Sequence, residues 1–125
     1  MKLRLVREAH GMGRLYINNV YLCFTMEDGD GEGDIDAGVY PVLVEFNEEF
    51  RQELPRILSD DEYWIYPAKP YGPHVDGVAI GTVRNSFGVV NGFIALEKLL
   101  VDLERAYDSG KDIELSIEES TEDKA

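Results

Sequence analysis

Short segments with strand-like alternation dominate this chain, and they constrain its fold more than any other feature. Apolar and polar residues alternate in segments 2–8 and 112–117, and β-branched and aromatic residues gather in 14–18 and 20–26. A period of two places successive side chains on opposite faces of a strand. Asn18-Asn19 lies between the last two segments, and asparagine tolerates the positive φ of a tight hairpin turn. The sequence therefore predicts a β-hairpin centred on this pair.

Proline limits the regularity of the middle of the chain. Segment 38–46 also has strand character, but it contains Pro41, which has no N–H to donate. We therefore expect this strand at a sheet edge or at a bulge. Prolines punctuate 47–76, which predicts an irregular region with short strands near 56–58 and 63–66. Two short apolar runs are present within 77–90.

Only segment 93–108 has the periodicity of a helix. Apolar residues recur there at intervals of three and four, at Phe93, Leu96, Leu99, Leu100, Leu103 and Tyr107. Such a stripe is typical of an amphipathic helix, and Gly110 is a plausible C-terminal stop. The order of many strands, one helix and one strand predicts an α+β fold with a mixed or antiparallel sheet. We expect a single globular domain over 1–118 and an acidic, disordered tail over 119–125.

The charge balance restricts the partners. The 125 residues include 25 acidic and 12 basic ones, giving a formal net charge of −13. Nucleic acid and anionic membranes are therefore disfavoured, whereas a basic protein or a cation remains compatible. No apolar run approaches the ~20 residues of a membrane span, and the alternating N-terminus is unlike a signal peptide. We expect a cytoplasmic protein.

Four stretches resemble a small uncharacterised family common in phages, prophages and bacteria. They are 13–18 with 24–28, then 36–40, then 50–56, and finally 77–80 with 86–90. Segment 13–18 reads Gly-Arg-Leu-Tyr-Ile-Asn and is similar to the family's G-x-L-Y-I motif. Segment 36–40 reads Asp-Ala-Gly-Val-Tyr and is similar to its P-A-G-T-Y motif. The four stretches occur in the same order as in the family, and together with the expected helix and last strand the resemblance spans nearly the whole chain.

The resemblance also implies a lost reaction. The family's His and Gly-Cys motif is similar to that of L,D-transpeptidases, which cross-link peptidoglycan through a cysteine thiolate. At the corresponding positions this chain has Gly81 and Val89. A nucleophile and a base are both required for such acyl transfer, so we expect no catalytic residues. The resemblance places a degenerate cleft around His74, Gly81, Arg84, Asn85, Ser86 and Val89.

Other nucleophiles and bases remain as an enzymatic alternative. Cys23 is the only cysteine, which excludes an internal disulfide, and it lies between Leu22 and Phe24 as a core residue would. His10 and His74 fall in glycine- or proline-bounded loops. A divergent peptidoglycan-modifying enzyme would have to use His74, Ser86 or Cys23.

An acidic, glycine-rich segment suggests a calcium loop. Acidic residues alternate with other residues at Asp28, Asp30, Glu32, Asp34 and Asp36, with Gly33 at the sixth position. Hard cations prefer such clustered oxygens. The twelfth position, however, is Val39 rather than a bidentate glutamate. A solvated loop without a cofactor is therefore the preferred interpretation, and calcium is the alternative.

An aromatic segment is the last candidate. Tyr63, Trp64, Tyr66 and Tyr71 lie close together in the sequence and predict either core packing, which we prefer, or a recognition surface. Taken together, these patterns favour a non-enzymatic accessory or structural module of phage or prophage type. It would bind a protein or a cell-wall component, and virion association is compatible with it. An acidic decoy that inhibits a basic nucleic-acid-binding protein is a further hypothesis. The oligomeric state is left open.

Overall fold

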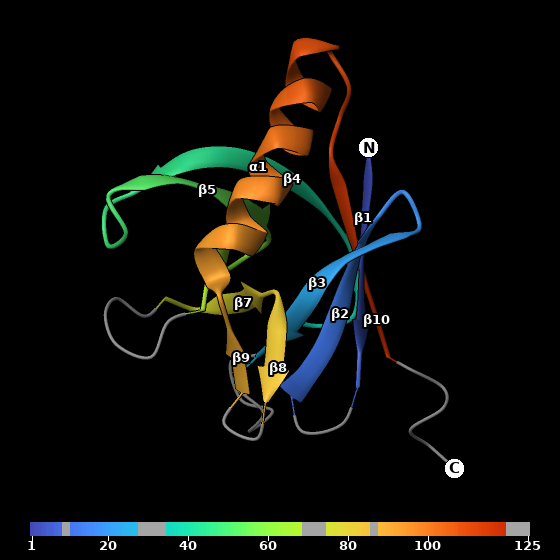
Figure 1. Ribbon diagram of the computed structural model, residues 1–125. Helices are drawn as coiled ribbons and strands as arrows, with labels where there is room; N and C mark the ends of the chain where they lie inside the picture. The colour runs from blue at the N-terminus through green and yellow to red at the C-terminus, as the bar shows by residue number, and fades with distance from the viewer. Residues whose placement is uncertain (9–10, 28–34, 69–74, 86–87, 120–125) are drawn as a thin grey trace.

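The described residues form a closed β-barrel and one helix. The computed structural model describes residues 1–8, 11–27, 35–68, 75–85 and 88–119. Its elements are β1 (Lys2–Arg7), β2 (Met12–Ile17), β3 (Val20–Met26), β4 (Gly38–Asn47), β5 (Gln52–Leu58), β6 (Glu62–Pro67), β7 (Gly77–Gly81), β8 (Val83–Asn85), β9 (Gly88–Val90), α1 (Gly92–Asp108) and β10 (Glu114–Glu119). The β-rich class with one helix is thereby confirmed (Figure 1).

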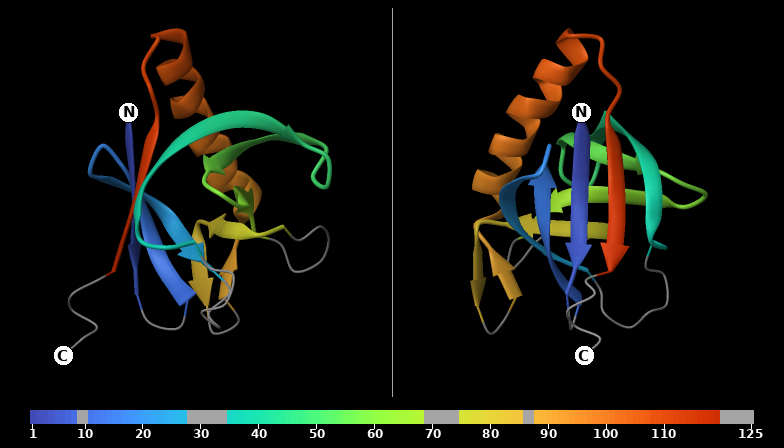
Figure 2. Two further views of the ribbon diagram at one scale, coloured as in Figure 1. Left: turned by 180° about the vertical axis from the view of Figure 1, so that it is seen from behind. Right: turned by 90° about the vertical axis from the view of Figure 1, so that its right-hand side faces the viewer.

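Eight strands close the barrel in the order β1-β10-β4-β5-β6-β7-β3-β2. The pairs β1–β10 and β6–β7 are parallel, and the other neighbours are antiparallel. Strands β8 and β9 form a separate two-stranded sheet. The first and last strands of the chain therefore lie side by side, as Figure 2 shows. The patterns in the sequence did not predict this closure.

The predicted hairpin is present, and its turn has the expected cause. Strands β2 and β3 pair from Met12↔Met26 to Ile17↔Val20, with a register irregularity between Leu15 and Tyr16. Asn18 and Asn19 connect them with φ values of 48° and 68°. Residues with a β-carbon rarely adopt this conformation, and asparagine is among the exceptions.

Two expectations for the proline-containing segments need correction. Strand β4 is not an edge strand, because its first half pairs with β10 and its second half with β5. Pro41 lies at the junction, where pairing to β10 ends and pairing to β5 begins at Val42. The region after residue 47 is more regular than predicted, since β5 contains Pro55 opposite Val44.

Strand β10 extends through Glu119, one residue beyond the expected domain limit.

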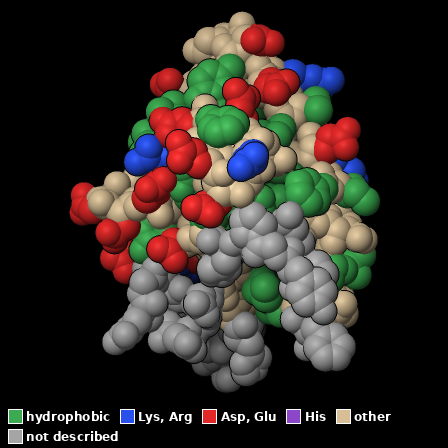
Figure 3. Space-filling view, turned by 90° about the vertical axis from the view of Figure 1, so that its left-hand side faces the viewer, with side chains coloured by type: hydrophobic (Ala, Val, Ile, Leu, Met, Phe, Trp, Pro, Cys, Tyr) green, Lys and Arg blue, Asp and Glu red, His purple; other side chains and the backbone are tan. Residues whose placement is uncertain are grey.

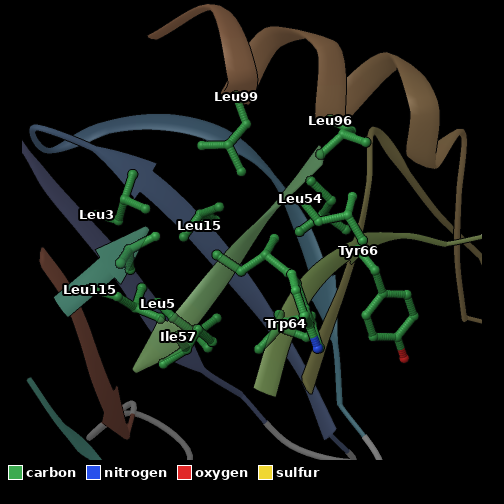
Figure 4. Close-up of a cluster of buried hydrophobic side chains, with 14 of the residues drawn as sticks. Leu3, Leu5, Leu15, Leu54, Ile57, Trp64, Tyr66, Leu96, Leu99 and Leu115 are labelled. Atoms are coloured by element: carbon green, nitrogen blue, oxygen red, sulfur yellow. The ribbon is translucent and has the colours of Figure 1, made fainter. Parts of the chain in front are cut away.

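The helix packs against β7, β6 and β3. Its buried residues are Gly92, Ala95, Leu96, Leu99, Leu103 and Ala106. Leu99 and Leu96 point from the helix toward Leu15 and Leu54 (Figure 4). Phe93 and Tyr107, which the apolar stripe included, are instead 48% and 43% exposed. The buried face of the helix instead includes the small residues Ala95 and Ala106, which allow the helix to lie close to the sheet.

Candidate functional site

A groove on one side of the barrel is a prominent concave feature of the described residues. The β4–β5 hairpin, β6 and residues 75–76 line it, and its volume is about 680 Å³. Five carboxylates contribute to the lining, those of Glu45, Glu48, Glu49, Glu62 and Asp76. The groove is thus strongly acidic, even within an acidic protein.

Arg56 and Trp64 both line the groove. They are register partners on β5 and β6, so their side chains share a face. The Arg56 guanidinium lies 5.9 Å from the centroid of the Trp64 ring. Its Nη1 donates a 2.9 Å hydrogen bond to Glu45, which raises the pKa of Arg56, while Trp64 Nε1 donates one of 3.1 Å to Glu62. Two of the five carboxylates are therefore engaged within the groove.

The rim of the groove is formed by the turn after β4. Asn47 is buried, and its Oδ1 accepts a 3.0 Å hydrogen bond from the backbone N–H of Phe50. This bond fixes the turn, in which Arg51 has a φ of 54°. The turn leaves Glu48 and Glu49 exposed, and the side chain of Phe46 is 61% exposed. The exposed ring of Phe46 is thus followed closely in the sequence by the exposed carboxylates of Glu48 and Glu49.

Figure 3 views the molecule from the side of the β4–β5 hairpin. Acidic side chains gather on this face, with hydrophobic side chains between them and few basic ones. Although the groove is acidic, no three acidic, histidine or cysteine side chains among the described residues come close enough to share one metal ion. The carboxylates line a surface rather than converge on a point.

Protein atoms fill the space beside Gly81, one of the positions of the expected degenerate cleft. A β-carbon on Gly81 would lie 2.2 Å from the carbonyl oxygen of Val90 and 2.4 Å from Cγ1 of Val89. Val89 is itself buried, at 5% exposure. A histidine at position 81 would therefore clash with the backbone of β9. His74 and Ser86 lie outside the described residues, as does His10.

Arg84 is held by two hydrogen bonds and one stacking contact. Its Nη2 donates to Glu8 at 2.8 Å and to the carbonyl of Gly13 at 2.9 Å. The guanidinium also stacks over Phe24, 4.5 Å from the ring centroid. Asn85 is exposed on β8, where it pairs with Gly88. Arg84 thus connects β8 to β2 and β3, and Asn85 lies apart from it on the strand surface.

Cys23 lies in the interior of the barrel. It is fully buried, and burial raises the pKa of its thiol to about 12. A hydrogen bond with the Gly81 backbone and the charge of Lys98 act in the opposite direction without reversing the shift. Since the thiolate is the nucleophile, burial and the raised pKa make Cys23 a poor nucleophile at neutral pH.

The aromatic candidates separate into different surroundings. Tyr63, Trp64 and Tyr66 are all buried, at 7%, 5% and 9% exposure. Tyr66 lies 5.8 Å from the ring of Phe50, whereas Trp64 lies under the groove. Tyr71 lies outside the described residues.

Only the edge of the proposed calcium loop can be placed. Asp28, Asp30, Glu32 and Asp34 lie outside the described residues. The carbonyl oxygen of Asp36 accepts a 2.7 Å hydrogen bond from the hydroxyl of Tyr40. The two ends of the loop are joined by Arg7, whose guanidinium binds both Glu27 and the carbonyl of Ile35.

The comparisons with known proteins return nothing: no family model, no curated protein and no solved structure matches this chain. Among the described segments, no helix combines the length and apolar character needed to cross a membrane.

Sequence reasoning missed the acidic groove. Its residues come from four separate stretches, and the barrel brings them together through the pairing of β4, β5 and β6. The one local signal was the run Phe46-Asn47-Glu48-Glu49, where an apolar residue and two acidic ones lie at the end of a strand. Trp64 was singled out, but its neighbours Arg56 and Glu62 were not.

Proposed function

We propose that this protein is a non-enzymatic binding module whose acidic groove takes a positively charged protein segment. The observation that carries the proposal is the groove itself: five carboxylates surround Arg56 and Trp64 in a cavity of about 680 Å³. Lysine or arginine side chains of a partner would complement the carboxylates. The exposed ring of Phe46 offers apolar contact beside them.

The charges that remain available favour a cationic partner. Glu45 and Glu62 already hold Arg56 and the Trp64 indole, so Glu48, Glu49 and Asp76 are the carboxylates most open to a partner. A rim charge chiefly governs the association rate and the choice of partner. The groove therefore suits a transient or moderate complex that is sensitive to salt.

The surroundings of the former motif positions support a binding role over catalysis. Val89 and the β9 backbone fill the space next to Gly81, and Cys23 is a buried thiol. An accessory or structural module of phage or prophage type fits the filled space beside Gly81 and the buried thiol of Cys23. A basic nucleic-acid-binding protein is one source of the positively charged segment, which makes the acidic decoy a special case of the same proposal.

Trp64 supplies a direct test, because it is the sole tryptophan and lies in the groove. A peptide rich in lysine and arginine should change its fluorescence saturably at about 0.15 M salt and lose affinity at higher salt. The variant Glu48→Lys/Glu49→Lys should weaken binding by about tenfold or more, since each lost ion pair contributes up to ~1 kcal/mol.

The matched control is Glu104→Lys/Asp108→Lys, which changes the net charge equally at exposed positions on α1 that do not line the groove. Equal loss in both variants would reduce the effect to overall charge and contradict the proposal. Intact peptidoglycan sacculi, tested in the same assay, address a cell-wall ligand. Binding to sacculi that survives the Glu48→Lys/Glu49→Lys change would also contradict the groove as the binding site.

A further inference from the structure

A second surface of the molecule is rich in arginine and aromatic side chains, whereas the groove is rich in carboxylates. On the outer side of β1, β2 and β3 lie Arg4, Arg14, Tyr16, Tyr21, Phe24 and Arg84, which we call the arginine–aromatic face. The register pairs Arg4↔Tyr16 and Arg14↔Phe24 place these side chains together. The alternate residues Leu3, Leu5, Leu15 and Cys23 are buried, so the arginine–aromatic face points outward.

The rings of this face form a continuous row. Tyr16 and Tyr21 meet edge to face at 6.0 Å, and Tyr21 and Phe24 meet in the same way at 5.7 Å. Guanidinium groups lie over both ends, with Arg4 5.8 Å from the ring of Tyr16 and Arg14 5.8 Å from that of Phe24. Tyr21 is 46% exposed. Tyrosine and arginine are the residue types that most often anchor protein interfaces.

Local charge on this face is positive in a chain of net charge −13. Glu118 pairs with Arg4, and Glu8 pairs with Arg84 and lies 3.8 Å from Arg14. Three guanidiniums thus face two carboxylates, and the side chain of Arg14 is 45% exposed. Arg4 is similarly exposed, at 44%, but it is held by Glu118 at 2.6 Å, so Arg14 is the exposed guanidinium with the weaker pairing and Tyr21 is the exposed ring.

The two surfaces lie on opposite sides of the barrel. In the strand order, β10 alone separates β1 of the arginine–aromatic face from β4 of the groove, and β7 alone separates β6 of the groove from β3 of the face. Figure 1 shows the same relationship, with the β4–β5 hairpin and the strands β1 and β2 at opposite sides. One side presents carboxylates next to Phe46, and the other presents guanidiniums next to Tyr21.

We infer that the acidic groove receives the arginine–aromatic face of a second copy of this chain. This inference rests on the proposed function of the groove and names its partner. The contact is heterologous, because the two copies use different surfaces. A dimer keeps one free groove, on one copy, and one free face, on the other, so the association continues head to tail into an open array or a ring. Net repulsion between copies is screened at physiological salt, whereas charge pairs in contact persist.

The experiment is sedimentation velocity over a range of protein concentrations at about 0.15 M salt. The wild type should form a series of oligomers that grows with concentration. The groove variant Glu48→Lys/Glu49→Lys and the face variant Arg14→Glu/Tyr21→Ala should each be monomeric, with self-association weakened by about tenfold or more. An equimolar mixture of the two variants should stop at dimers, because only one intact groove and one intact face remain per pair.

Three results would overturn the inference: a monomeric wild type at every concentration, variants that associate like the wild type, or a mixture that stays monomeric. If the face variant does not unfold cooperatively, Arg14→Gln replaces it and should weaken association in the same direction. A monomeric wild type that still binds the basic peptide at the groove overturns self-association alone. If the oligomers dissociate on adding the basic peptide, both the proposed peptide binding at the groove and self-association through it are supported, because the peptide and the second copy then compete for one groove.

Discussion

Arg7 and Glu27 form a two-pronged ion pair that is almost closed off from solvent. Nε of Arg7 lies 2.9 Å from Oε2 and Nη2 lies 2.8 Å from Oε1, while the two side chains are only 14% and 6% exposed. The same guanidinium reaches Glu119 on β10 at 3.2 Å, and Glu27 raises the pKa of Arg7 above its ordinary value. One side chain on β1 therefore joins the ends of β3 and β10.

Replacing Arg7 with methionine should destabilise the protein by about 3–5 kcal/mol, because Glu27 would remain buried and charged without a partner. Urea unfolding gives the free energy. The double variant Arg7→Met/Glu27→Leu should recover much of the loss. The comparison is Arg4→Met, whose pair with Glu118 is 44% and 39% exposed and should cost less than about 1 kcal/mol. Equal effects of the two arginine variants would contradict the role of burial.

Gly81→Ala should destabilise the fold by at least about 2 kcal/mol, since its β-carbon would meet the Val90 carbonyl oxygen at 2.2 Å. The control is Gly110→Ala, where nothing lies within 4 Å and only the φ of 70° opposes a side chain. That change should cost about 1 kcal/mol. Thermal unfolding of both variants measures the difference, and a neutral Gly81→Ala would show that β9 can move away from β7.

The thiol of Cys23 should resist modification in the native protein. With a pKa of about 12 it is almost wholly protonated at pH 8, so a disulfide reagent should react only as the chain unfolds. The native labelling rate should rise with added urea. Fast labelling without denaturant would contradict the burial of this residue.

The raised pKa of Cys23 also predicts a pH dependence. The ordinary pKa of 9.0 applies to the unfolded chain and about 12 to the folded one, so the unfolded state releases the proton first as the pH rises. The stabilising contribution is complete below pH 9 and is lost progressively between pH 9 and 12. The unfolding free energy of the wild type minus that of Cys23→Ala should therefore decrease between pH 8 and pH 11. A constant difference would show that the thiol titrates equally in both states.

Arg56→Gln should strengthen binding of a basic peptide severalfold, because it removes a cation from the groove and frees Glu45. The pair is about a third exposed on each side, so stability should change by less than about 1 kcal/mol. The Trp64 fluorescence titration measures the change in affinity. Weaker binding by Arg56→Gln would indicate that Arg56 itself contacts the ligand.

Local patterns predicted the elements that local chemistry determines. The turn at Asn18-Asn19 requires positive φ, and the helix over 92–108 results from recurring leucines. The extent of β5 was predicted poorly, because a proline is expected to interrupt a strand, whereas Pro55 lies within β5 opposite Val44. The exact face of the helix was also missed, since close packing selected alanine over the larger Phe93 and Tyr107.

The barrel and the groove depend on contacts between distant segments, which no local pattern encodes. Closure requires Leu3 to pair with Leu115, and the groove requires Arg56 to meet Glu45 and Trp64. In the sequence, the acidic residues on the outer side of these strands look like ordinary solvent-exposed positions. They can be recognised as a shared acidic site only when the strand order is known, because that order places them around one groove.

The parallel pairing of β1 with β10 sets the order of events during synthesis. Glu114 lies far downstream of its partner Lys2 in the sequence, so the two cannot meet until the whole segment between them has been made. Until then β1 has one edge unpaired, and an open strand edge invites pairing with other chains. The barrel can therefore close only after β10 has been made, and a ribosome stalled before residue 114 would hold a chain whose β1 edge is still unpaired.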